Sequence, residues 1–180
     1  MTATLKPLTD FLVNLGIERV PHTQKNYLAH LISVANFMRA HGADEELCRA
    51  GMFHSIYGTE KFQGFKLTLD QRDELTALIG PRAELLAYWN CFMDRSSLDR
   101  LLGQTAGPYP IRNRETGEIM TLSREEFDDL CRVHLFDWLE QAPRSSFGWD
   151  YRRDAYRQMA ERLGGEALVA YEKVFALEPA

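Results

Sequence analysis

Two histidines and an aspartate stand at the edges of apolar helical patterns. His30 borders an apolar stripe within residues 23–41, His54 comes near the end of a stripe within residues 44–57, and Asp94 directly follows the apolar run at 85–93. Two imidazoles and one carboxylate can hold a single divalent ion and leave positions open for water or substrate. His30, His54 and Asp94 are therefore candidate ligands of one divalent ion. The alternative is a site without metal, in which the histidines are core residues paired within the protein and Asp94 is ordinary helix surface charge.

The spacing of the two histidines supports their convergence. The turn between their helices falls at Gly42-Ala43, and His30 and His54 lie about equally far before and after it. In two antiparallel helices such positions reach similar heights along the pair. Asp94 joins them if its own helix packs across both.

The order of these residues resembles the metal site of the HD superfamily. The resemblance rests on residues 27–35 around His30, residues 48–55 ending in His54-Ser55, and Asp94-Arg95, and it covers roughly residues 20–100. The spacing of the two histidines is similar to that of the guanosine-tetraphosphate hydrolase branch. This resemblance implies a bundle of helices, a divalent metal ion (Mn, Fe or Zn) held by His30, His54 and Asp94, and hydrolysis of a phosphate-containing small molecule.

One departure from the family changes the expected metal count. The aspartate of the His-Asp pair is Ser55 here, and the acidic pair that follows in the hydrolase branch falls on Gly58 and Thr59. A neutral hydroxyl is a poorer ligand than a carboxylate and does not neutralise two cations. The expected site is therefore degenerate and holds one ion.

Further residues are candidates for substrate binding and catalysis around this site. Arg95 and Arg72 are candidate anion contacts, Glu60 is a candidate base, and the candidate ligand-binding residues are His22, Ser55, Tyr57 and Thr59. His22 stands about two helical turns before His30 if that helix starts early. The block from Ala50 to Thr59 also resembles a family of short proteins with the pattern Ala-Gly-x-Phe-His-Ser-x-Tyr-Gly-Thr, and this second resemblance implies no activity. The block also fits a plain loop with Gly58 at positive φ.

Two other functions use the same residues. Two histidines and one carboxylate also suit an Fe(II) oxygenase. A third possibility is a metal-free relative that binds a ligand or a partner on the helical scaffold, for example at the loop of Phe62 and Phe65. His134 and Asp137, three residues apart, are interpreted as a surface pair.

The periodicity predicts an all-α fold, an HD-like bundle of seven to eight helices with one small β-hairpin. We expect one domain over 1–180, with a core at 20–102 and a C-terminal helical extension at 123–178. The hairpin is expected between residues 108 and 122. The expected helices are 8–15, 23–41, 44–57, 68–79, 82–102, 123–141, 148–163 and 166–176. Asp44 is expected to cap the third of these helices, and capping boxes are expected at Thr68-Gln71 and Ser123-Glu126. The predicted core includes Leu31, Val34, Phe53, Trp89 and Phe92.

Composition restricts the partners. A net charge of −5 gives no electrostatic reason to bind nucleic acid or anionic lipid. The three cysteines are far apart, which favours reduced thiols and a cytoplasmic protein over a disulfide framework. Residues 1–7 lack signal-peptide features, and no apolar run is long enough to span a membrane. Signatures of P-loop, Rossmann, α/β-hydrolase and zincin sites are absent from the sequence. A small-molecule substrate remains the expected partner, and oligomeric state stays open.

Overall fold

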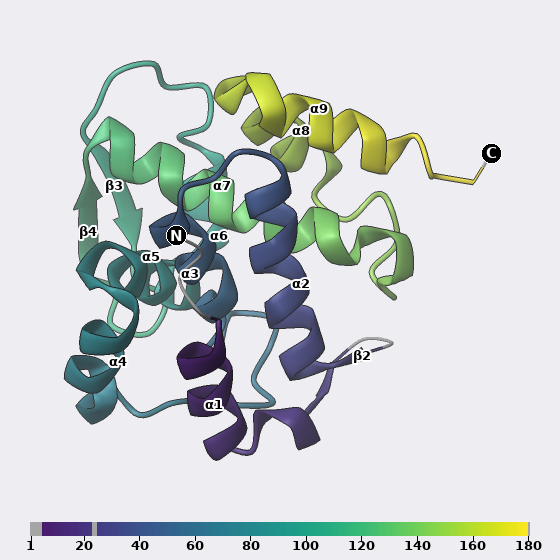
Figure 1. Cartoon of the computed structure of the whole chain (residues 1–180). Coiled ribbons are helices and arrows are strands. Elements are labelled where there is room, and N and C mark those ends of the chain that lie inside the picture. The colour runs from purple at the N-terminus through teal and green to yellow at the C-terminus, as the bar shows by residue number, and fades with distance from the viewer. Residues whose placement is uncertain (1–4, 23–24, 180) are drawn as a thin grey trace.

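The computed structural model of the chain describes residues 5–22 and 25–179, and this part is mostly helical (Figure 1). Nine α-helices lie within it: α1 (Lys6–Asn14), α2 (Tyr27–Ala40), α3 (Glu45–Phe53), α4 (Arg72–Ile79), α5 (Pro81–Phe92), α6 (Arg95–Asp99), α7 (Arg124–Gln141), α8 (Arg153–Leu163) and α9 (Gly165–Phe175). Short 3₁₀ turns cover Ile17–Arg19, Leu69–Gln71 and Ala142–Arg144. The all-α prediction with a small hairpin is confirmed.

The expected hairpin pairs strand β3 (Tyr109–Arg112) with strand β4 (Ile119–Leu122). The pairing is antiparallel, with Tyr109 opposite Leu122. A second short ladder was not predicted and joins β1 (Pro21–His22) to β2 (Lys25–Asn26). Because of it, the second helix begins at Tyr27 and not at residue 23. Residues 23 and 24, expected as the start of that helix, lie outside the described residues, as do residues 1–4 of the N-terminal segment.

Side-chain caps explain where several helices begin. The Asp44 carboxylate accepts a hydrogen bond of 2.8 Å from the backbone N–H of Leu47 at the start of α3. Ser123 and Glu126 form the predicted capping box of α7. The capping box expected at Thr68 is wrong, since its side chain caps no backbone group and a 3₁₀ turn precedes α4.

The predicted helix over 82–102 is broken in the structure. Helix α5 ends at Phe92, Met93 is extended at φ −66° and ψ 138°, and a separate helix α6 starts at Arg95. The hairpin segment causes the break: Met93 forms a bridge with Asn113, and the backbone N–H of Asp94 donates to the carbonyl of Arg112 at 2.8 Å. These long-range pairs replace helical ones, so Asp94 becomes the N-cap of α6.

Three helices meet where the site lies. Helix α2 packs on α3, and α7 packs on both of them and on α5. Helices α8 and α9, drawn in yellow-green and yellow, pack together and against α7 (Figure 1). A cluster of buried apolar residues extends from Leu8 to Tyr171. The burial predicted for Leu31, Val34, Phe53, Trp89 and Phe92 is confirmed.

No helix among the described residues combines the length and apolar character needed to cross a bilayer.

Candidate metal centre

Two histidines and one aspartate converge between helices α2, α3 and α7. His30 comes from the first turn of α2, His54 is the C-terminal cap of α3, and Asp137 comes from the last turns of α7. One potential ligand atom from each side chain lies within 4.8 Å of the other two. All three residues are buried. The predicted meeting of His30 and His54 is therefore found, with their ring centroids 5.2 Å apart.

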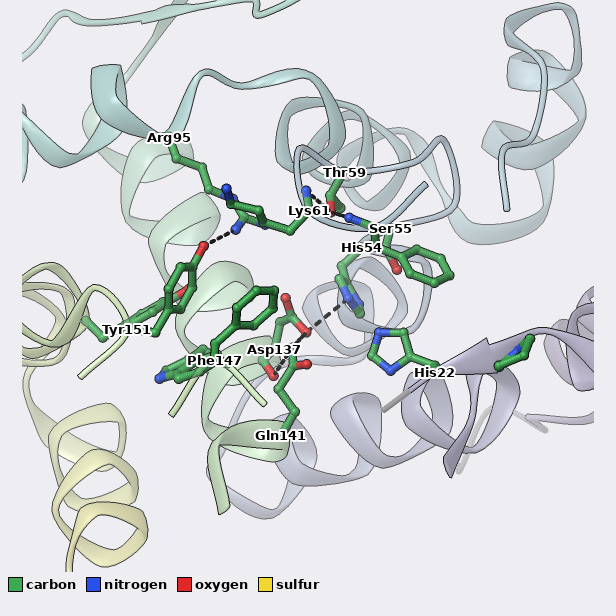
Figure 2. Close-up of a pocket in the computed structure, with 14 residues that line it drawn as sticks. His22, His54, Ser55, Thr59, Lys61, Arg95, Asp137, Gln141, Phe147 and Tyr151 are labelled. Atoms are coloured by element: carbon green, nitrogen blue, oxygen red, sulfur yellow. Dashed lines mark hydrogen bonds and ion pairs between the residues drawn. The ribbon is translucent and has the colours of Figure 1, made fainter. Parts of the chain in front are cut away.

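Hydrogen bonds at the far side of each ring turn the Nε2 atoms toward Asp137. Nδ1 of His30 donates to the Glu140 carboxylate at 2.7 Å, and Nδ1 of His54 donates to the backbone carbonyl of Gly51 at 2.7 Å. Both Nε2 atoms lie 3.2 Å from Oδ1 of Asp137 (Figure 2, dashed for His54). Nδ1 keeps its proton in this arrangement, so Nε2 of a neutral ring is the lone-pair nitrogen.

The arrangement needs positive charge, supplied either by protons on the rings or by a metal ion. Lone pairs of two neutral imidazoles aimed at a carboxylate oxygen repel it unless protons or a metal ion lie between them. Nε2 of His30 is buried and makes no hydrogen bond. Ligand atoms bound to one ion at roughly 2.1 Å are about 3.0 Å apart at a right angle and about 3.4 Å apart at the tetrahedral angle. The two nitrogen-to-oxygen distances of 3.2 Å lie inside that range, and all three atoms lie within 4.8 Å of one another, so this donor set could hold a divalent ion.

The protonation equilibria reflect the same cluster. Burial opposes a charge on His30, but the carboxylates of Asp137 and Glu140 outweigh it and raise the pKa of His30 above its ordinary value. Burial likewise opposes the charge on Asp137, yet the two imidazoles hold the pKa of Asp137 well below its usual range. The carboxylate is therefore ionised at neutral pH, as a metal ligand must be.

Asp94, the third expected ligand, is not part of this group. Its carboxylate accepts hydrogen bonds from the backbone N–H and the hydroxyl of Ser96, at 2.9 and 2.7 Å. The physical reason is the break after Phe92, which makes Asp94 a helix cap. Asp137 takes the expected place of Asp94, from a later helix.

The interpretation of His134 and Asp137 as a surface pair is wrong. Both are buried, and no hydrogen bond joins them. His134 instead donates from Nδ1 to the side chain of Asn90 at 3.0 Å and accepts at Nε2 from Arg152 at 2.6 Å. The Asn90 amide donates to the backbone carbonyl of His54 at 2.7 Å. This network fixes the backbone of one candidate ligand to helices α5 and α7.

A cavity of about 200 Å³ opens beside the candidate metal centre. Figure 2 shows Asp137 near its middle, with His54 and His22 on one side and Arg95, Tyr151 and Phe147 on the other. Its walls also include Ser55, Thr59, Lys61, Phe62, Trp138 and Gln141. Two of the three candidate ligands, His54 and Asp137, thus face a space that water or a small substrate can enter.

Four predicted site residues besides the ligands line this cavity: His22, Ser55, Thr59 and Arg95. The His22 ring stacks on that of His30 at 4.2 Å, and burial together with His30 lowers the pKa of His22 to about 4. The Ser55 hydroxyl lies 2.8 Å from that of Tyr27. Thr59 accepts from the backbone N–H of Phe62 at 3.0 Å.

The other three lie outside the cavity. The Tyr57 hydroxyl donates to the Glu84 carboxylate at 2.7 Å, and Arg72 forms a double hydrogen bond with the same carboxylate. Glu60 is exposed and accepts a long bond of 3.4 Å from the backbone N–H of Arg95. Their expected roles in anion binding, ligand binding and base catalysis find no support in this placement, because none of them lines the cavity.

Sequence reasoning missed Asp137 as a candidate ligand and Glu140 as the partner of His30. Asp137 stands within the otherwise apolar run from Leu135 to Leu139 on α7. An acidic residue in such a run is rarely buried without a partner. That position, and the one-turn spacing to Glu140, is the signal that could have identified both.

A family model described as a domain of unknown function (DUF6817) matches residues 11–95. The matched segment includes His30 and His54 and ends before Asp137. No curated protein and no solved structure matches the chain.

Proposed function

We propose that this chain is an HD-like, metal-dependent hydrolase of a phosphate-containing small molecule, with one divalent ion held by His30, His54 and Asp137. One observation carries the proposal: both imidazole Nε2 atoms lie 3.2 Å from the same carboxylate oxygen, at the edge of a cavity. The third ligand also comes from a later helix, as the HD resemblance implies. Ser55, which replaces the family aspartate, lines the same cavity beside His54.

A divalent ion, when bound, supplies a water of lowered pKa and a Lewis acid for a phosphoryl oxygen. Arg95 supports a phosphate substrate in particular. Its side chain is buried, lines the cavity and has a planar set of donors that matches phosphate oxygens. Lys61 adds a second cationic side chain to the same wall. Glu60 has no part in the proposal, because it does not line the cavity.

The first test is metal content after purification without chelator. We expect stoichiometric Mn, Fe or Zn in the parent protein and loss of that metal in Asp137→Asn. Asp94→Asn is the matched control, since it removes the same charge from a residue outside the group, and it should keep the metal. Equal metal in Asp137→Asn and the parent would refute the proposed centre.

The second test is turnover of phosphate esters by the metal-loaded protein, measured as released inorganic phosphate. Hydrolysis by the parent and Asp94→Asn, but not by Asp137→Asn, supports the hydrolase. The two-histidine, one-carboxylate donor set also suits an Fe(II) oxygenase. Iron as the bound metal, with oxygen consumption and no phosphate release, would favour that function. A parent protein that binds no added metal would favour a metal-free binding protein.

A further inference from the structure

The cavity wall opposite His54 is aromatic. Phe147 is 53% exposed, which is unusual for so large an apolar side chain, and its ring stacks on that of Tyr151 at 4.9 Å and 26°. Tyr151 in turn packs on Trp138 at 5.1 Å. All three rings line the cavity. The Phe147 ring is thus supported from one side and exposed elsewhere, which suits stacking with a flat ligand.

Next to this aromatic wall lies the guanidinium of Arg95, a group that can bind an anion. Its Nη1 donates to the Tyr151 hydroxyl at 2.8 Å, while its Nε is buried and makes no hydrogen bond. None of the described carboxylates forms an ion pair with this guanidinium, although the residue is only 8% exposed. Arg95 is thus a largely buried, cavity-lining cation without a carboxylate partner, and an anionic ligand would supply the missing countercharge.

Arg95 and Phe147 both contact Tyr151, and this limits the shape of the ligand. Arg95 contacts Tyr151 at its hydroxyl and Phe147 contacts Tyr151 at its ring face. An anion at Arg95 and a ring on Phe147 are therefore separated by about the size of one phenol group. Figure 2 shows these three residues together on the side of the cavity away from His54 and His22.

We propose that the natural ligand is a phosphate monoester whose alcohol carries a flat ring, with the phosphoryl group between Asp137 and Arg95 and the ring against Phe147. This rests on the proposed hydrolase function. In the reaction, a bond forms between phosphorus and the oxygen of water, and the bond from phosphorus to the ester oxygen breaks. The alcohol leaves with a proton from that water, so the products are phosphate and the free ring-bearing alcohol.

The test compares two probes with the same anionic group, phenylphosphonate and methylphosphonate, which hydrolysis cannot consume. Binding to the full chain is measured by calorimetry with and without added Mn²⁺. We expect phenylphosphonate to bind roughly threefold to tenfold more tightly than methylphosphonate, the range that one aromatic contact gives. Phe147→Ala should abolish this difference and Phe147→Tyr should keep it. Ile119→Ala, at a similarly exposed apolar residue on the hairpin, is the control and should leave it unchanged.

Equal affinities of the two probes for the parent protein would overturn the proposal, as would an unchanged affinity ratio in Phe147→Ala. Binding of both probes should also weaken in Arg95→Gln, and unaltered binding would remove the assigned anion contact. Phosphate release and ring-dependent binding together distinguish a failure of this inference from a failure of the proposed function. Phosphate release from esters without any ring preference would contradict the inference alone, whereas ring-dependent binding without hydrolysis would contradict the hydrolase and leave the ring-binding site in place.

Discussion

The Glu140 carboxylate accepts a hydrogen bond of 2.7 Å from Nδ1 of His30, on the side of the ring away from Asp137. Arg144, one turn later, forms an ion pair with the same carboxylate. A carboxylate in this position fixes the tautomer and the orientation of a metal-binding imidazole and makes it a better ligand. Glu140 therefore belongs to the site, although it does not line the cavity.

Glu140→Gln should weaken metal binding by about tenfold to a hundredfold, the usual effect of losing such a partner. The amide keeps the size of the side chain but removes its charge, so His30 is held less firmly. Metal affinity is measured by competition with a chromophoric chelator. Glu172→Gln, an exposed site on α9, is the control. An unchanged affinity in Glu140→Gln would mean that this hydrogen bond does not act on the metal centre.

Local sequence signals were sufficient for most of the fold. The apolar periodicity predicted the helices, and Asp44 and Ser123 marked two of their starts because side-chain caps act within one turn. The five predicted core residues are buried. The break after Phe92 was not predictable in this way, because pairing of Met93 with Asn113 overrides a helical pattern that is locally continuous.

The break after Phe92 also explains why Asp94 was wrongly predicted as the third ligand. Two of the three candidate ligands, His30 and His54, follow from the turn between adjacent helices. The third depends on which later helix crosses them, and this is set by long-range packing. A continuous helix would have left Asp94 on the fifth helix near the core, whereas α7 supplies Asp137 from a position more than eighty residues after His54.

Trp89→Ala tests the packing of α5. Trp89 is 8% exposed and belongs to the main apolar cluster, so its removal should lower the free energy of unfolding by about 3–5 kcal/mol. Chemical denaturation measures the change. Leu177→Ala, at a residue 65% exposed, should change the free energy by no more than about 0.5 kcal/mol. A similar small change for Trp89→Ala would contradict the burial of that side chain.

His134 gives the stability of the protein a predictable pH dependence. Burial, and then the charge of Arg152, lower the pKa of His134 well below its ordinary value. The unfolded chain takes up a proton there near pH 6.5 while the folded chain does not. The unfolded state thus binds more protons, so the free energy of unfolding falls as pH drops below about 6.5.

His134→Gln isolates this effect, because glutamine can donate to Asn90 and accept from Arg152 without titrating. Other groups, including His30 and Asp137, titrate in both proteins and cancel in the difference. The stability of the parent relative to the variant should fall by about 2 kcal/mol between pH 7.5 and pH 5. Urea denaturation at several pH values provides the measurement. A difference that stays constant with pH would show that His134 is not held neutral in the folded protein.

Ser55 offers a test of the HD resemblance itself. Its side chain is buried beside His54, lines the cavity, and lies 2.8 Å from the Tyr27 hydroxyl. The resemblance implies an aspartate at this position. A carboxylate here could accept from Tyr27 and add a ligand with negative charge beside the two imidazoles.

Ser55→Asp should therefore bind Mn²⁺ more tightly than the parent, by at least about tenfold. The reason is that an added ligand should change the metal affinity at least as much as a hydrogen-bond partner of a ligand does. Without metal the variant should be less stable, because it buries a further charge, and Mn²⁺ should restore stability since it binds the folded state. Ser55→Asn is the matched control, with the same size and no charge, and should show neither gain. If Ser55→Asp binds Mn²⁺ no better than Ser55→Asn, then position 55 does not face the ion as the family aspartate does. The resemblance would then rest on the helical scaffold alone. The centre formed by His30, His54 and Asp137 is tested separately, by the metal content of the parent protein and Asp137→Asn.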